Sequence, residues 1–216
     1  MASFHVIRHA GPLTAMRRLA TDRWRRPAGL VIWRLLGTGR GAETGPSADL
    51  RRTAVFAVWE DDAALERYVA TPRARVLERY DVRLHLIGGH GRWGGVDVLD
   101  GLQMGPCDGP LAVLTRASVR LRHWPAFRAA SRVVSAELAA ADGLLAALGM
   151  GELPVGRLGT FSLWRSADDM EAFATAPRHA ETVRRTRAEG WYREELFARF
   201  APAGASGTWD GRDPLA

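Results

Sequence analysis

His179 is the side chain best placed for metal chemistry in this sequence of 216 residues. It follows Pro177, a residue suited to the first turn of a helix, and it begins a stripe of apolar and small residues at helical spacing that continues through Val183 and Thr186. We therefore expect its imidazole to face inward, toward a cavity. A partly desolvated imidazole in such a place can bind haem iron through one ring nitrogen. The alternative is a core histidine whose ring is hydrogen-bonded to a backbone carbonyl.

Further side chains are candidates for contacts with a bound haem or with an oxygen species on it. Val183 lies one turn after His179 and is expected to contact the cofactor, and Arg187 lies two turns after it and is a candidate partner for a propionate. Arg8 and Arg116 are expected at equivalent positions near the ends of two matching strands, where an inward guanidinium would polarise a bound oxygen species or pair with a haem propionate. The alternatives are a rim arginine paired with Glu or Asp for Arg8 and Arg116, and a solvated helix face for Arg187.

The other thiol and imidazole groups offer weaker sites. Cys107 is the one cysteine, which excludes an intrachain disulfide and multi-cysteine metal sites, and its place among turn formers favours a bystander thiol over a haem thiolate ligand. His5 and His9 lie on one face of a predicted strand, but four residues at about 3.3 Å each put them about 13 Å apart, too far to share a metal. We expect His85 and His90, which flank a Gly-rich turn, at the surface.

An internal repeat predicts the elements that position these side chains. Residues 1–104 and 111–216 are two copies of one unit, joined by a linker of turn-forming residues at 105–110. The matched positions include Trp59 with Trp164, Pro72 with Pro177, Gly37 with Gly149, and Trp93 with Trp209.

Within each copy, hydrophobic period and turn residues predict the order strand, helix, strand, strand, helix, strand, which is the ferredoxin-like unit. We therefore predict an α+β fold in which two such units, each with helices on one face of its sheet, close into a dimeric α+β barrel within one chain. The second copy is longer, and its extra residues predict a helix from Pro177 to Phe200 with no counterpart in the first copy. The position equivalent to His179 in the first copy is Ala74, so one special site is expected, not two. In the first copy the second helix is expected at 61–80 and the last strand at 81–87.

A group of motifs near the carboxy terminus is specific enough to suggest a family. The motifs are Phe161-Ser-x-Trp164, His179, Arg187-Ala188-Glu189-x-Trp191, and Gly207-x-Trp209-x-Gly211-x-Asp213-Pro214. This pattern resembles spheroidene monooxygenases, which are carotenoid-oxidising enzymes described as containing haem, and a looser likeness covers nearly the whole chain. The resemblance implies haem b as the cofactor and His179 as its ligand. One departure is that members carry two histidines just before this helix, whereas Pro177-Arg178-His179 keeps only the second.

The residues and the resemblance together predict a haem-dependent monooxygenase that inserts oxygen into a carotenoid or another apolar metabolite. Two alternatives stay open. One is a cofactor-free oxygenase of the same architecture, in which histidine and tryptophan side chains only orient the substrate. The other is a non-enzymatic binder of haem or of another apolar ligand. The expected partners are an apolar small molecule and an electron donor such as a ferredoxin, and a homodimer is compatible with the fold.

The composition bounds the location and the partners. Hydrophobic residues make up 47% and charged residues 25%, as in globular proteins. The net charge of +6 is carried by arginine in a chain without lysine, which indicates codon bias, and we find no arginine stripe interleaved with aromatic residues, so nucleic-acid binding is not expected. No apolar run approaches the roughly 20 residues of a membrane helix, and no signal-peptide pattern is found. We expect a cytoplasmic protein.

Overall fold

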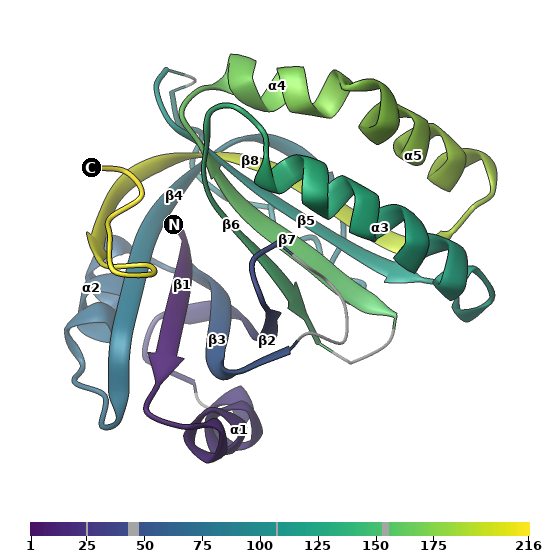
Figure 1. Ribbon diagram of the computed structural model, residues 1–216. Coiled ribbons are helices and arrows are strands. Elements are labelled where there is room, and N and C mark those ends of the chain that lie inside the picture. The colour runs from purple at the N-terminus through teal and green to yellow at the C-terminus, as the bar shows by residue number, and fades with distance from the viewer. Residues whose placement is uncertain (25, 43–47, 107, 153–155) are drawn as a thin grey trace.

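Eight antiparallel strands form a closed barrel with helices on its outer side (Figure 1). This computed structural model describes residues 1–24, 26–42, 48–106, 108–152 and 156–216. The strands follow one another around the barrel in the order β1-β3-β2-β6-β7-β5-β8-β4. The fold is therefore of the mixed α+β kind, as predicted.

Each half of the chain contributes four neighbouring strands. The first half contains β1 (Ala2–His9), α1 (Pro12–Thr21), a short 3-10 turn η1 (Asp22–Trp24), β2 (Leu30–Gly39), β3 (Ala48–Trp59), α2 (Asp62–Ala70) and β4 (Val76–Gly91). The second half contains β5 (Leu111–Val119), η2 (Leu121–His123), α3 (Trp124–Ala139), β6 (Leu144–Gly151), β7 (Arg157–Trp164), α4 (Ala167–Thr175), α5 (Pro177–Ala188) and β8 (Tyr192–Gly207). In both halves the sheet order places the first strand between the third and the fourth.

Two seams of unequal length join the halves. Strands β4 and β8 pair along most of their length, from Tyr80 with Gly207 to Gly91 with Leu196. Strands β2 and β6 pair only at Gly37 with Gly151 and at Thr38 with Met150. The barrel is thus held closed mainly through β4 and β8.

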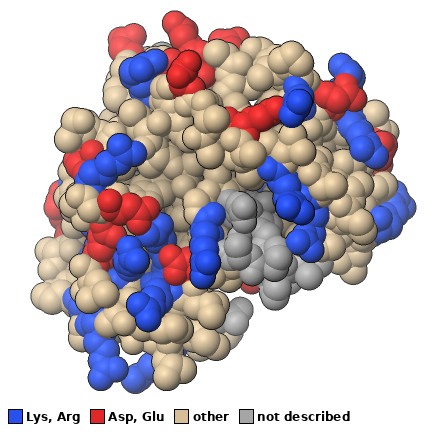
Figure 2. All heavy atoms as spheres, in the orientation of Figure 1, with Lys and Arg blue, Asp and Glu red and all other residues tan. Residues whose placement is uncertain are grey.

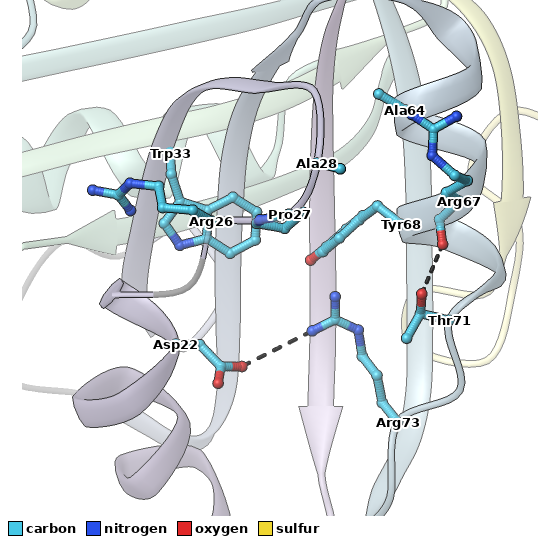
Figure 3. A pocket seen from close by; sticks show the side chains of 10 residues that line it. All are labelled: Asp22, Arg26, Pro27, Ala28, Trp33, Ala64, Arg67, Tyr68, Thr71 and Arg73. Carbon is cyan, nitrogen blue, oxygen red and sulfur yellow. Dashed lines mark hydrogen bonds and ion pairs between the residues drawn. The ribbon is translucent and has the colours of Figure 1, made fainter.

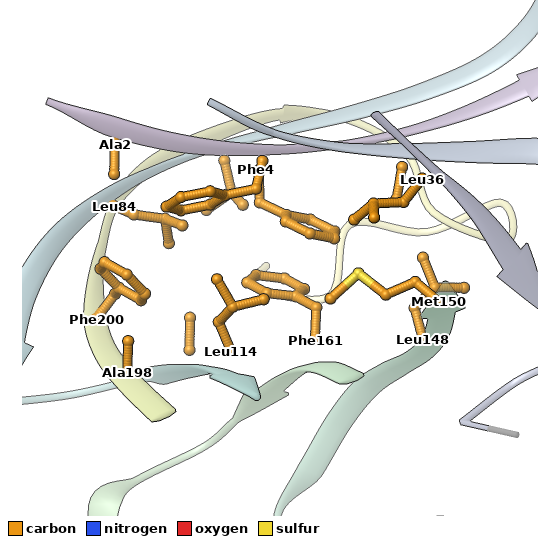
Figure 4. Packing of buried hydrophobic residues seen from close by; sticks show 14 of the residues in the cluster. Ala2, Phe4, Leu36, Leu84, Leu114, Leu148, Met150, Phe161, Ala198 and Phe200 are labelled. Atoms are coloured by element: carbon orange, nitrogen blue, oxygen red, sulfur yellow. The ribbon is translucent and has the colours of Figure 1, made fainter. Parts of the chain in front are cut away.

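Apolar side chains fill the barrel interior (Figure 4). The rings of Phe4 on β1 and Phe161 on β7 stack across it with centroids 3.8 Å apart. Leu36, Leu114 and Phe200 are buried in the same cluster and come from β2, β5 and β8. Alternation along each strand sends every second side chain to this core and the others to the outer face.

Helices cover the outer faces, and capped starts fix two of them. The Asp61 side chain accepts a hydrogen bond from the backbone N–H of Ala64 at 2.7 Å and caps α2, and Ser166 caps α4 in the same way through Asp169. Helix α2 lies over the first half, and α3, α4 and α5 lie over the second (Figure 1). Within the described parts of the chain, no helix is both long and apolar enough to cross a membrane.

Two predicted helices are too long. Helix α2 ends at Ala70 and β4 begins at Val76, so the helix predicted at 61–80 is wrong beyond the Thr71-Pro72 break. Helix α5 ends at Ala188, where Gly190 takes a φ of 61° and closes it, and the predicted continuation to Phe200 is strand β8. In β8 the buried residues Leu196, Ala198 and Phe200 alternate with outward-facing ones, which is the period of a strand.

Arginine and carboxylate side chains lie close together on the face seen in Figure 2. Ion pairs of this kind also form around Asp210, which pairs with Arg52 and lies 3.7 Å from a guanidinium nitrogen of Arg8. The excess of arginine is therefore partly neutralised by neighbouring carboxylates.

Candidate functional site

His179 lies on the outer side of the barrel, in the first turn of α5. Pro177 begins that helix, as predicted. The imidazole packs against the ring of Phe173 at the end of α4, with centroids 4.8 Å apart, and Phe173 in turn packs against Trp164 and Leu111 on the outer face of the sheet. His179 is therefore half-buried on the outer side of the barrel, and the filled barrel interior is not the space that it faces.

The two ring nitrogens of His179 have different surroundings. Nδ1 lies 2.9 Å from the backbone carbonyl oxygen of Ala174, which can only accept, so Nδ1 carries the proton and donates it. Among the described residues Nε2 has no hydrogen-bond partner. An imidazole held in this way presents the lone pair of Nε2, the arrangement that a second-shell carbonyl gives to metal-binding histidines.

The helices beside His179 are incompletely packed against the sheet. Leu138 is the one buried residue of the 16-residue α3, and Thr186 is the one buried residue of the 12-residue α5. On the sheet below, the hydroxyls of Thr115 and Thr160 form a hydrogen bond of 2.8 Å and both residues are half-buried. The layer between these helices and the sheet is thus less tightly filled than the barrel interior.

Val183 and Arg187 follow His179 along α5 with different exposure. Val183 is half-buried and shares the sheet-facing side of the helix with Thr186. Arg187 is exposed and lies at the edge of the sheet-facing side of α5. The structure brings Val183 toward His179 and leaves Arg187 at the solvent boundary.

Arg116 is buried at one end of the barrel, on the opposite face of the sheet from His179. Its guanidinium pairs with the carboxylates of Glu194 and Glu152, the latter at 3.3 Å, and lies 5.9 Å from the ring of Trp93. The alternative of a rim arginine paired with carboxylates is the arrangement found. Glu152, Glu194 and Trp93 were not predicted as its partners, because they come from three separate segments of the chain.

Arg8 lies near the end of β1, on the strand face of Phe4 and Val6, and does not occupy the position that corresponds to Arg116. Its side chain is 45% exposed and its partner is Asp210. Arg116 pairs in register with Gly159, and the residue matching Gly159 in the first half, Ala54, pairs with Val6. The two arginines therefore do not form a symmetric pair.

A buried polar network in the first half was missed by sequence reasoning. His5 Nδ1 lies 2.5 Å from Asp81, and its Nε2 lies 2.8 Å from the hydroxyl of Ser3, which also accepts a hydrogen bond from the Trp59 indole. Burial lowers the pKa of His5 in spite of the neighbouring Asp81, so the imidazole is neutral. Ser3 and His5 are fully buried, and the array has the order of a catalytic triad but no access for a substrate. The sequence signal was the placement of Ser3 and His5 on one strand face.

The remaining candidates take no part in a described site. No cluster of three or more potential metal ligands exists among the described residues. Cys107 lies outside the described residues. His85 is half-buried and His90 is exposed, near the surface as expected.

Two hollows lie away from His179. One of 380 Å³ is bordered by α2 and the start of β2. The other, of 610 Å³, follows the weakly paired β2–β6 seam and includes Met16, Trp24, Leu50 and Met150 among its lining residues. His179 lines neither of them.

Three curated proteins named spheroidene monooxygenase are similar to this chain. The protein of Rhodobacter capsulatus is 32% identical over 194 residues, which are 86% of this chain and 80% of the relative. That of Rubrivivax gelatinosus is 34% identical over 187 residues, 82% of this chain and 70% of the relative. The chain belongs to the spheroidene monooxygenase family. No protein-family model matches the sequence.

The third spheroidene monooxygenase that matches this chain is a longer protein. The protein of Cereibacter sphaeroides is 31% identical over 192 residues, and the match spans 85% of this chain but only 59% of that relative. Two crystal structures of aldoxime dehydratase share the fold with TM-scores of 0.58 and 0.57, at 12% and 10% identity. They cover 93% of this chain and 80% and 79% of their own chains.

The donor chemistry at His179 fits a haem. An imidazole with Nδ1 donating to Ala174 and with Nε2 unpartnered can bind iron through Nε2, and its neighbours Phe173 and Val183 are apolar. By contrast, the guanidinium of Arg116 already has two carboxylate partners and lies across the sheet.

Proposed function

We propose that this protein is a haem-dependent monooxygenase, an oxidoreductase that inserts oxygen into an apolar substrate, in which His179 would hold the haem iron. Membership of the spheroidene monooxygenase family supports the reaction class. The unpartnered Nε2 of His179 is the observation that carries the cofactor and its place.

The residues around His179 have separate roles in this proposal. The carbonyl of Ala174 fixes the tautomer and the orientation of the ring. Phe173 and Val183 would keep water from the ring of His179. The exposed Arg187 would pair with a haem propionate at the solvent boundary. A bound haem supplies the activation of dioxygen or peroxide, and the protein supplies ligation, orientation and polarity.

Arg116 and Arg8 have weaker support as catalytic residues. Arg116 would need to exchange Glu152 or Glu194 for another partner before it acted on a substrate. Arg8 lies at the surface beside Asp210. We assign the carboxylate-paired Arg116 to closing one end of the barrel, and its catalytic role stays a prediction.

An absorption spectrum tests the haem proposal. Protein produced with adequate haem, or mixed with hemin, is expected to show a Soret band, and His179→Ala is expected to weaken or shift that band because the axial nitrogen is lost. His85→Ala is the matched control, since it removes a half-buried imidazole from strand β4. Arg187→Gln is expected to weaken hemin binding by a few-fold and leave the band position unchanged, since it removes one exposed ion pair.

Two results would overturn parts of the proposal. A wild-type protein that stays colourless with excess hemin would contradict haem binding and favour the cofactor-free oxygenase. Haem binding without turnover of any apolar substrate, carotenoids included, under reducing or peroxide conditions would favour the non-enzymatic binder.

The substrate, the electron donor and the assembly are proposed from the same reasoning. The relatives are named for their action on spheroidene, and we propose a carotenoid or a similar apolar metabolite for this chain. A ferredoxin-like donor would supply electrons to the haem. A homodimer is the assembly to examine first by light scattering, and a cytoplasmic location is proposed with it.

We also propose that the barrel arose by tandem duplication of one ferredoxin-like unit, residues 1–104 and 111–216 joined at 105–110. The halves share their element order and sheet order. They also share details, since the indoles of Trp59 and Trp164 each donate to a serine hydroxyl. Helix α5 has no counterpart in the first half, which agrees with a single haem site.

A further inference from the structure

The 380 Å³ hollow of the first half is lined by residues of α2, a helix that lies across the barrel from α5 (Figure 1). Helix α2, the chain before β2 and the segment after α2 enclose it (Figure 3). Its volume falls within the range of about 300–1,000 Å³ that is usual for small-ligand pockets. It is therefore large enough for a compact molecule.

Three buried polar groups that line this hollow have no hydrogen-bond partner among the described residues. They are the hydroxyl of Tyr68, the indole Nε1 of Trp33 and Nε of Arg73. Tyr68 is 5% exposed and the side chain of Arg73 is 9% exposed. Buried polar atoms in proteins are nearly always satisfied, so three orphans around one space indicate that a ligand completes them.

All three orphan groups carry an N–H or O–H and offer donors. In Figure 3 the hydroxyl of Tyr68 points away from α2 toward Trp33, and the guanidinium of Arg73 reaches up beneath it. The Arg73 guanidinium lies 4.3 Å from the centroid of the Tyr68 ring. Burial raises the pKa of Tyr68 to about 12, which keeps its hydroxyl protonated near neutral pH. A ligand at this place must therefore be an acceptor.

The charge around the hollow favours a single negative charge. Asp22 lies 4.0 Å from Arg73 but also pairs with Arg18 at 3.2 Å, so Arg73 is not fully neutralised. Arg26 and Arg67 add two further cations to the lining. A dianion such as phosphate would meet the carboxylate of Asp22, whereas a carboxylate needs only one facing guanidinium and one hydroxyl.

The lining also has an apolar part. Trp33 and Tyr68 meet edge to face with centroids 5.5 Å apart, and Pro27, Ala28 and Ala64 lie in the same wall, beside the polar Arg26 and Thr71. We propose that this hollow is a second ligand site, separate from His179, and that it binds a small carboxylic acid with an apolar, ring-sized body. The carboxylate accepts hydrogen bonds from Arg73, Tyr68 and the indole N–H of Trp33, and the apolar body lies against Pro27, Ala28 and Ala64.

Benzoate is the probe that tests this site, with binding followed by calorimetry and by intrinsic tryptophan fluorescence. We expect benzoate to bind, and the neutral isostere benzamide to bind at least about 10-fold more weakly because it lacks the charge that pairs with Arg73. Arg73→Gln is expected to weaken benzoate binding by about 10-fold or more. Tyr68→Phe, which keeps the ring, is expected to weaken it by about 2-fold to 10-fold.

Matched controls separate the site from general effects. Arg120→Gln removes an exposed arginine in the other half and is expected to leave benzoate binding unchanged, as is His179→Ala. Inorganic phosphate is expected not to displace benzoate. The proposal is overturned if wild-type protein does not bind benzoate, if benzamide binds equally well, or if the folded Tyr68→Phe and Arg73→Gln variants bind as the wild type does.

Discussion

Burial keeps the imidazole of His5 neutral, and this makes the first half of the barrel sensitive to acid. Desolvation lowers the pKa of His5 below its ordinary value of 6.5, and it outweighs the attraction of Asp81. His9 behaves similarly, because burial lowers its pKa as well and Arg18 adds to the effect. Asp81 stays ionised, since His5 and Arg79 overcome its own burial cost and lower its pKa.

These shifts fix the sign of the pH dependence. Because folded His5 binds a proton less readily than the unfolded chain does, unfolding takes up protons below pH 6.5. The contribution of His5 to the free energy of unfolding is therefore expected to be complete above pH 6.5 and to decrease as the pH drops from 7 to 5. The loss of the Asp81 interactions begins only at lower pH, toward the ordinary value of 3.8. Urea denaturation at pH 5, 6 and 7 measures the change.

His5→Gln tests the assignment of this slope. Glutamine retains hydrogen-bonding capacity beside Ser3 and Asp81 but does not titrate, so the variant is expected to be less stable at pH 7 and to lose less stability on acidification. The slope that remains belongs to His9 and to the amino group of Met1, whose pKa burial also lowers. An unchanged slope in His5→Gln would show that the proton uptake occurs elsewhere.

Sequence reasoning reached the position of His179 but not its surroundings. Pro177 and the stripe through Val183 and Thr186 identified the helix and its inward side correctly. The partners of Arg116 and the Ser3–His5–Asp81 array depend on strand register between distant segments, which a single sequence does not specify. For the same reason the hollow beside Tyr68 had no local signal.

At the scale of elements, the β4–β8 seam depends on a glycine. A Cβ at Gly89 would lie 2.5 Å from the backbone oxygen of Phe197 and 2.9 Å from the Cα of Ala198. Gly89→Ala is therefore expected to force the strands apart and to cost about 1–3 kcal/mol or more. Chemical denaturation of the variant measures this loss.

Gly37 offers a matched substitution at the other seam. A Cβ there would meet only the backbone oxygen of Gly151, at an ordinary distance of 3.8 Å. Gly37→Ala is expected to change stability by no more than about 0.5 kcal/mol. Equal losses in the two variants would contradict the unequal roles of the seams.

The element order was predictable from the repeat, whereas two boundaries were not. The residues around Phe197 fit a helical spacing as well as a strand period, and the strand is stabilised by pairing with β4 and β5, which are distant in sequence. Local pattern alone therefore extended the helix from Pro177 past its end at Ala188. Similarly, the pattern at 61–80 did not reveal that β4 begins at Val76.

At the scale of the whole molecule, each half presents the apolar face of its sheet to the other. The ring of Phe4 in the first half stacks on that of Phe161 in the second, and the ring centroids of Phe56 and Phe200 are 6.2 Å apart. A half on its own would expose this face and leave the edges of β4 or β8 unpaired. The two halves are thus expected to be interdependent in folding.

Separate expression of residues 1–104 and 111–216 tests that interdependence. Each fragment alone is expected to aggregate or to lack cooperative unfolding, whereas coexpression restores a 1:1 complex through the long β4–β8 seam. Phe161→Asp in the second fragment is expected to abolish the complex, because it places a charge against Phe4 in the filled interior. Arg184→Asp, at an exposed position of α5, is the control that leaves assembly intact. If either fragment unfolds cooperatively as a monomer, its sheet is stable without the partner half, and the barrel is an association of two autonomous domains.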